Sequence, residues 1–356
     1  MQRLVTRPLI IAGVVLVGAG IVTITPVTAA PTVPARFFEV QLTGGTEDIE
    51  DITLDLVRHG QSTDDLNGIL GTLPPGAPLT ALGEQQADQV SQAIQAEFPG
   101  GIAGIYASEL IRTQETMDPL AQALGMDVQV LPDLNEIPAG IFEEAPRNLI
   151  SEFSFFSPMA AWILGDLFVP EPGTTYNGAV FDEQVTNAVD TIYSNTIAGD
   201  GPTTDVASSS GGVIAIWALM NVKNPDFLPI IQSALENGGP PPNAGQAILE
   251  GNPTDGWTLV SWDGIPVPQT PDLLTGLFVD YRDVVIPEQL ALWNVWEAIQ
   301  GGDQADITSA LQTGYDQVVA ALQQFPQAVW ETITGSLGDS SGMAGASVVD
   351  GMLGAM

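Results

Sequence analysis

The fold is decided by the stretch Thr53-Leu54-Asp55-Leu56-Val57-Arg58-His59-Gly60-Gln61-Ser62. Residues 53–57 are mostly apolar and run into a polar loop, which is typical of a buried strand. Open α/β sheets bind ligands at the carboxyl ends of strands, so Arg58 and His59 stand at a candidate site. Arginine offers a planar, permanently charged donor group for phosphate oxygens. A neutral histidine can act as a nucleophile, and Gly60 lets the chain turn sharply beside a ligand.

Strand-like and helix-like segments alternate along the next two hundred residues, which predicts an α/β fold with a doubly wound, mainly parallel sheet flanked by helices. An apolar insert at about 146–180 interrupts this rhythm and is interpreted either as a lid over the site or as extra core. Helices are expected from Thr80, from Ser108, at 181–194 and after Ser210. Strands are expected at 53–57, 102–106, 128–131, 205–209 and 257–262.

The N-terminus is typical of an export signal. Arg3 and Arg7 precede an apolar run at 9–24, and small residues follow up to Ala30. An uncleaved membrane anchor is the alternative, because the run is nearly long enough to span a bilayer. We therefore expect a secreted or cell-envelope protein, extracytoplasmic in either case.

The predicted domain organisation follows from these segments. The expected order is a signal peptide at 1–30, a linker at 31–51, an α/β domain at 52–286, a C-terminal helical extension at 287–334 and a flexible tail at 335–356. Pro326 is expected to separate a last short helix from the rest of the extension.

The charge balance excludes several classes of function. The chain has 43 acidic and 8 basic residues, a net charge of -35, no cysteine and one histidine, His59. Such a surface repels nucleic acid, so no nucleic-acid partner is expected. Thiolate and multi-histidine metal sites are excluded by composition, and neither a metal nor a cofactor is expected.

Three further segments extend the first motif in order. Leu79, Thr80 and Gly83 open a helix. Ser108 stands four residues before Arg112, which Thr113 follows, and Leu134 stands two residues before Glu136. Together with Arg58-His59-Gly60, these segments resemble the histidine phosphatase superfamily, phosphoglycerate-mutase-like branch, over residues 54–144.

The resemblance implies a role for each matching residue. His59 would attack phosphorus, Arg58 and Arg112 would hold the phosphoryl oxygens, and Glu136 would protonate the leaving group and then activate water. Weaker candidates for phosphate donors are Gln61, Ser62, Ser108 and Ser210.

The chain departs from the family pattern at a later strand end. The family has a second histidine before Gly-Gly, and here Ser210 precedes Gly211 and Gly212. A serine hydroxyl carries no charge, and losing one transition-state donor costs about 3–4 kcal/mol, so reduced activity is expected. Ser210 as an esterase nucleophile is disfavoured, because the Gly-x-Ser-x-Gly pattern is absent.

Three hypotheses follow. The first is an exported phosphatase that hydrolyses phosphomonoesters through a phosphohistidine at His59. The second is a pseudo-enzyme that binds a phosphorylated small molecule or another phospho-ligand without turnover. The third is an envelope interaction protein whose working surface is the helix face of Trp293 and Trp296. Membrane contact is expected only through an uncleaved N-terminal segment.

Overall fold

The structure is a computed structural model that describes residues 50–227, 230 and 240–353, with side chains described as far as Ser336. The predicted signal peptide and nearly all of the predicted linker lie outside the described residues. Within the described residues, no helix combines the length and the apolar character that a membrane span requires.

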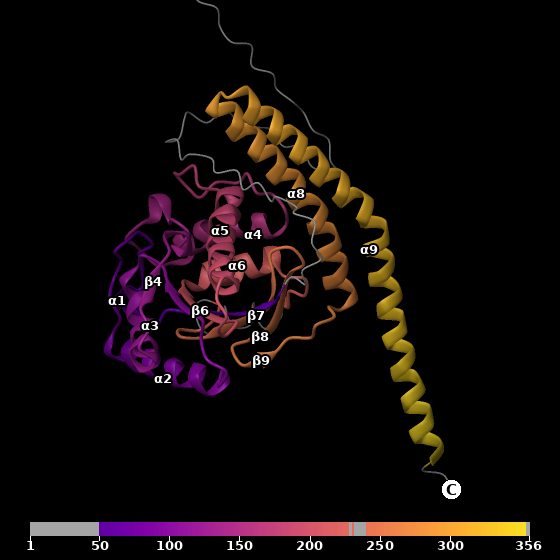
Figure 1. The fold of residues 1–356 in the computed structure, drawn as a ribbon, viewed down its shortest axis with the longest axis horizontal. Helices are drawn as coiled ribbons and strands as arrows, with labels where there is room; N and C mark the ends of the chain where they lie inside the picture. Colours follow the sequence, from indigo (N-terminus) through magenta and orange to yellow (C-terminus); the bar gives the residue numbers. More distant parts are fainter. Residues whose placement is uncertain (1–49, 228–229, 231–239, 354–356) are drawn as a thin grey trace, which may run out of the picture. The chain divides into compact units, whose positions relative to one another are not determined.

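A mixed, mostly parallel sheet forms the centre of the α/β domain (Figure 1). Its order across the described residues is β4-β3-β6-β1-β7-β8-β9. Strands β4, β3, β6 and β1 run parallel, and β7, β8 and β9 continue the sheet with antiparallel pairing. The strands are β1 (Ile52–Arg58), β3 (Gly104–Ala107), β4 (Val128–Val130), β6 (Thr204–Ser209), β7 (Gln246–Asn252), β8 (Gly256–Trp262) and β9 (Ile265–Pro266). A separate small pair joins β2 (Ile69–Leu70) to β5 (Ala145–Pro146).

Helices cover both faces of the sheet because successive strand residues point to opposite sides. On β1, Leu54 and Leu56 belong to one buried cluster and Val57 to the other. The Val57 side is covered by α2 (Ala81–Glu97) and α3 (Ile111–Leu124). The opposite side is covered by α4 (Leu149–Ile163), α5 (Gly178–Ile197) and α6 (Gly211–Asn221). This two-sided packing is the doubly wound architecture that the alternating sequence pattern predicts.

The insert is part core and part pocket wall. In α4, Trp162 is fully buried and stacks on Phe181 of α5, with ring centroids 5.6 Å apart. Phe155 and Phe156 of the same helix line the cavity beside His59. The burial of Trp162 agrees with the extra-core interpretation, and a role of this segment as a lid stays a prediction.

The C-terminal helical extension is present but differs in its boundaries. Helix α8 (Leu273–Gly301) begins fourteen residues before Pro287. Asp272 caps its first turn by accepting hydrogen bonds from the amides of Leu274 and Thr275. Helix α9 (Gln304–Leu353) continues through Pro326, so the predicted separation at that residue is wrong. The segment after residue 335 is helical as far as Leu353, and its flexibility stays a prediction.

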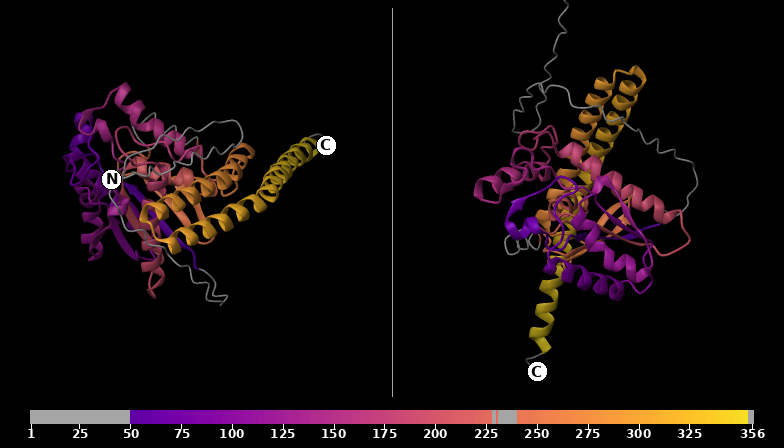
Figure 2. Two further views of the ribbon diagram at one scale, coloured as in Figure 1. Left: turned by 90° about the horizontal axis from the view of Figure 1, so that it is seen from above. Right: turned by 90° about the vertical axis from the view of Figure 1, so that its left-hand side faces the viewer.

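Close packing between α8 and α9 rests on glycine. A side chain at Gly314 would lie 2.9 Å from the Ala291 side chain, and one at Gly276 would lie 2.7 Å from the Thr332 side chain. The two helices run side by side in both views of Figure 2. Glycine at these contacts lets their backbones approach closely.

Candidate active site

Three parallel strands end at the same edge of the sheet and carry the motif residues there. His59 follows β1, Ser108 follows β3 and Ser210 follows β6. The strand register places Arg58 beside Ser209, and the His59 amide donates a hydrogen bond to the Ser209 carbonyl at 3.1 Å. The edge at which the sequence predicts ligand binding is therefore assembled by the sheet itself.

Two glycines set the loop that carries His59 against the start of α2. A side chain on Gly60 would lie 2.6 Å from the Gly83 carbonyl oxygen, and one on Gly83 would lie 2.2 Å from the Gln61 carbonyl oxygen. The two backbones therefore meet without intervening side chains. The Thr80 hydroxyl caps α2 by accepting a hydrogen bond from the Gly83 amide at 3.1 Å. This contact gives the Leu-Thr-x-x-Gly segment a physical function, which is to hold the loop.

His59 is buried and held in one orientation. Its Nδ1 lies 2.8 Å from the Gly60 carbonyl oxygen, which only accepts, so Nδ1 carries the proton and Nε2 keeps the lone pair. Burial and then the positive charge of Arg112 lower the pKa of His59 to about 3, although Asp65 acts in the opposite direction. The imidazole is therefore neutral at neutral pH, which is the form a nucleophile requires.

Arg58 and Arg112 are both buried and both line the same cavity as His59. Arg58 Nη1 donates to the Pro241 carbonyl oxygen at 2.8 Å. Arg112 is the second residue of α3, and its Nε and Nη1 atoms have no hydrogen-bond partner in the described part of the chain. A buried charged donor without a partner is costly, so this guanidinium is suited to receive an anion.

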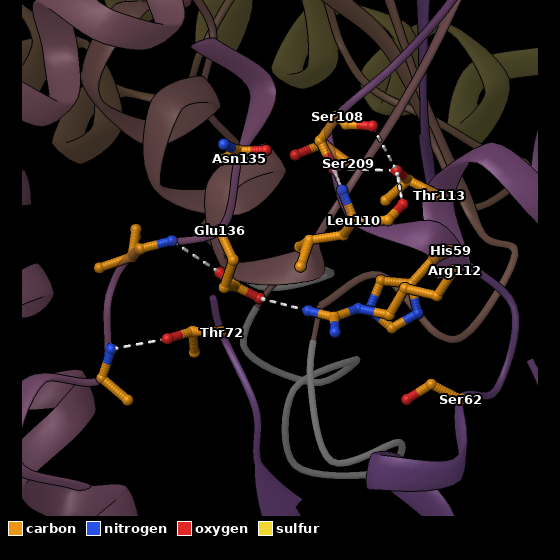
Figure 3. A network of polar contacts seen from close by, with 12 residues as sticks. His59, Ser62, Thr72, Ser108, Leu110, Arg112, Thr113, Asn135, Glu136 and Ser209 are labelled. Atoms are coloured by element: carbon orange, nitrogen blue, oxygen red, sulfur yellow. Dashed lines mark hydrogen bonds and ion pairs between the residues drawn. The ribbon is translucent and has the colours of Figure 1, made fainter. Parts of the chain in front are cut away.

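Glu136 faces Arg112 across the cavity, as Figure 3 shows. Its Oε2 lies 4.0 Å from Arg112 Nη2, and its Oε1 accepts a hydrogen bond from the Ile137 amide at 3.1 Å. Gly212 at the start of α6 approaches the same carboxylate, since a side chain there would lie 3.4 Å from Oε1. Glu136 therefore lies at the pocket wall beside a predicted phosphate-binding residue.

Two of the weaker candidates for phosphate donors, Gln61 and Ser108, lie outside the cavity. Gln61 accepts a hydrogen bond from the Thr80 hydroxyl at 2.9 Å, and Ser108 bonds to the Thr113 hydroxyl at 2.8 Å (Figure 3). Neither residue lines the described cavity. The structure therefore does not bring them into the site, because their polar atoms hold the loop and the start of α3.

Ser62 and Ser210 lie closer to the predicted phosphate position. Ser62 lines the cavity and caps α1 (Thr63–Asn67), where its hydroxyl bonds to Asp65. Ser210 is 1% exposed, precedes the cavity residue Gly211, and its hydroxyl has no hydrogen-bond partner among the described residues. Its role as a phosphate donor stays a prediction.

Two charged residues of the pocket were not assigned by the sequence analysis. Asp65 lies 3.6 Å from Arg58 and 3.8 Å from His59, measured between the nearest side-chain oxygen and nitrogen atoms. Arg147, just before α4, lies 4.0 Å from Asp65 and lines the cavity. The scarcity of positive charge was the available signal, because Arg147 is one of only 8 basic residues in the chain.

The cavity that these residues line is small, about 40 Å³. That volume has room for a few water-sized groups, hence for a phosphoryl group rather than a whole metabolite. Its wall combines three arginines, three acidic residues and two aromatic side chains, which are Arg58, Arg112, Arg147, Asp64, Asp65, Glu136, Phe155 and Phe156.

Comparison with known proteins agrees with this geometry. Residues 54–225 match the sequence model described as "Histidine phosphatase superfamily (branch 1)". The PE-PGRS family protein PE_PGRS11 of Mycobacterium tuberculosis is 44% identical over 297 residues, or 81% of this chain and 49% of that protein. The probable phosphoglycerate mutase GpmB of Yersinia enterocolitica is 39% identical over 92 residues, or 26% of this chain and 40% of that protein. The chain thus spans about half or less of the length of these relatives.

Among solved structures, that of mycobacterial glucosyl-3-phosphoglycerate phosphatase in complex with VO3 aligns with 60% of this chain and 98% of its own. The identity is 20% and the TM-score 0.44. The family match includes the strand end at His59, the helix start at Arg112 and the segment of Glu136. Residues 54–225 therefore match the histidine phosphatase superfamily, branch 1, and this match covers 172 of the 356 residues.

Proposed function

We propose that this protein is an exported phosphatase that hydrolyses phosphomonoesters through a phosphohistidine at His59, with reduced activity. The observation that carries the proposal is the pair of unpartnered, buried Arg112 donors beside a neutral histidine, within the described residues. A pocket built this way in a chain of net charge -35 favours an anion at that point. The proposed export of the protein rests on its N-terminal sequence alone.

The proposed reaction has two steps. His59 Nε2 attacks phosphorus while the ester P–O bond breaks, and Glu136 gives a proton to the leaving oxygen. Water then attacks the phosphohistidine, Glu136 takes a proton from it, and the P–N bond breaks to release inorganic phosphate. Arg58 and Arg112 stabilise the charge on the phosphoryl oxygens in both steps.

Hydrolysis of a generic aryl phosphate by the exported form tests this proposal. His59→Ala, purified identically, serves as the control for contaminating phosphatases. We expect the variant to lose at least about 10³-fold in rate, because no other histidine can take over the attack. Equal rates for the two proteins would exclude phosphatase activity at His59.

The pseudo-enzyme hypothesis predicts a different pair of results. Neither the wild type nor His59→Ala would hydrolyse the ester. Inorganic phosphate would still bind, and titration calorimetry would show that this binding depends on Arg112. Ser210 motivates this alternative, because the pocket lacks the charge of a second histidine.

The interaction hypothesis places its working surface on Trp293 and Trp296 of α8, and only Trp296 fits it. Trp296 is 51% exposed, whereas Trp293 packs against the core beside Phe168, so the two tryptophans do not form one outward face. Exposed apolar side chains continue along α8 and α9 at Leu292, Ile299, Leu311, Tyr315 and Leu322. Exposed apolar side chains on these helices are compatible with a protein partner, and this hypothesis is secondary to the phosphatase proposal.

A further inference from the structure

The Asp65 carboxylate is held in place from several sides. Its Oδ2 accepts hydrogen bonds from the Ser62 amide at 2.9 Å, the Ser62 hydroxyl at 3.0 Å and the Asn243 side-chain amide at 3.3 Å. The Asp65 amide in turn donates to the Ser62 hydroxyl at 3.1 Å, which completes a capping box at the start of α1. Its position beside the pocket is therefore fixed rather than adaptable.

This carboxylate faces three basic side chains. Oδ1 lies 3.6 Å from Arg58 Nη2 and 4.0 Å from Arg147 Nη2, and Oδ2 lies 3.8 Å from His59 Nδ1. Burial acts to raise the pKa of Asp65, but His59 and Arg58 outweigh it and hold this pKa below its ordinary value. Asp65 is therefore ionised at neutral pH.

Asp65 faces the Nδ1 edge of the imidazole of His59. Nδ1 is the protonated nitrogen, and Nε2 on the other edge is left to attack phosphorus. When Nε2 bonds to phosphorus while Nδ1 keeps its proton, the ring becomes cationic. Of the charged groups that act on this ring within the described residues, Arg112 from α3 and Arg58 from β1 oppose a positive charge, and Asp65 from α1 favours it.

We propose that Asp65 is a positioning residue whose charge lies at the Nδ1–H edge of His59, where it stabilises the cationic phosphohistidine and lowers the affinity for phosphate. The inference rests on the proposed phosphatase function. Asp65 lowers the affinity for phosphate because the same carboxylate engages Arg58 and Arg147 and repels an incoming phosphate dianion. Asp65 thus has opposite effects on binding and on turnover, which a purely structural residue would not have.

The Asp65→Asn variant separates these two effects, since asparagine keeps an oxygen for the capping box and removes the charge. We expect KM for an aryl phosphate and Kd for inorganic phosphate each to fall by about tenfold, and kcat to fall by about tenfold. Asp88→Asn, which removes the same charge from an exposed position on α2, is the matched control and should change none of these values.

Three results would overturn the inference. They are unchanged kcat and KM, a kcat that rises as KM falls, and a lower kcat with a higher KM and a lower melting temperature. The last would mean that Asp65 acts only through the capping box.

A readout that needs no turnover separates this inference from the proposed function. His59 is the only histidine in the chain, so ¹⁵N-histidine labelling gives the NMR signals of one imidazole. We expect Asp65→Asn to shift the Nδ1 resonance of the resting protein, and an unshifted resonance would contradict the contact. The two proposals can fail separately. If the wild-type protein shows no turnover while Asp65→Asn still shifts the Nδ1 resonance and binds phosphate more tightly, the phosphatase proposal is refuted and the Asp65–His59 contact is supported.

Discussion

Under the proposed function, Ser210 is the residue expected to set the level of activity. It stands at the end of β6, buried, next to Gly211 of the cavity, and its hydroxyl has no partner among the described residues. A hydroxyl there can donate one hydrogen bond to a phosphoryl oxygen but adds no positive charge. The proposed mechanism therefore assigns most of the transition-state stabilisation to Arg58 and Arg112.

Replacement of Ser210 by histidine restores a chargeable donor at this position. We expect kcat for an aryl phosphate to rise by about 10²–10³-fold over the wild type, the reverse of losing one transition-state donor. Ser210→Ala provides the comparison, and a thermal melt shows whether the larger side chain is accommodated. A folded Ser210→His protein without any gain in kcat would show that residue 210 does not face the phosphoryl group.

Residue identities in the pocket were predictable only where a motif carried them. Arg58, His59, Arg112 and Glu136 occur in ordered segments, and the structure brings all four to one cavity. Arg147 lies outside those segments and reaches the cavity only because β5 pairs with β2. Tertiary pairing of this kind leaves no local pattern in the sequence.

The sequence predicts the bounds of those helices and strands that have a clear apolar periodicity. It does not predict those that form only because they pack against a neighbouring element. The strand predicted at 53–57 is β1, and the helix predicted at 181–194 is α5. Strand β7 was missed because its apolar run is only Ala247 to Leu249 and glycines stand close on both sides. It forms because β1 offers it a neighbouring edge for antiparallel pairing.

Helix α8 shows the same competition between local signal and packing. The sequence predicts the helical extension from residue 287, whereas α8 begins at Leu273. Buried contacts of Val279, Arg282 and Ile286 hold the preceding residues in the same helix. Arg282 Nη1 donates to the carbonyl oxygens of Leu219 and Val222 at 3.1 and 2.9 Å, which ties α8 to the end of α6.

Across the whole molecule, buried carboxyl groups make stability depend on pH. Burial raises the pKa of Asp55 and of Glu171 to about 8, and that of Asp182 and of Asp205 to about 6. A raised folded-state pKa stabilises the fold at low pH, and this contribution is lost as pH rises through the folded value. His59, lowered to about 3, acts oppositely, but only as pH falls below its ordinary value of 6.5.

Between pH 6.5 and 8.5 the carboxyl groups therefore decide the trend. We expect a higher melting temperature at pH 6.5 than at pH 8.5, and the net charge of -35 acts in the same direction. Asp55→Asn removes the ionisation of one group with a folded-state pKa near 8 and should make the dependence shallower. Equal or greater stability at pH 8.5 would show that these carboxyl groups are already ionised in the folded protein.

The most direct test of the central claim is to trap the phosphorylated protein. Brief incubation with a ³²P-labelled phosphomonoester, an alkaline quench and peptide mapping would locate the label, because phosphohistidine survives alkali. The account predicts label on His59, none in His59→Ala, and release of the label as inorganic phosphate on longer incubation. Turnover that persists in His59→Ala, or label on any residue other than His59, would contradict it.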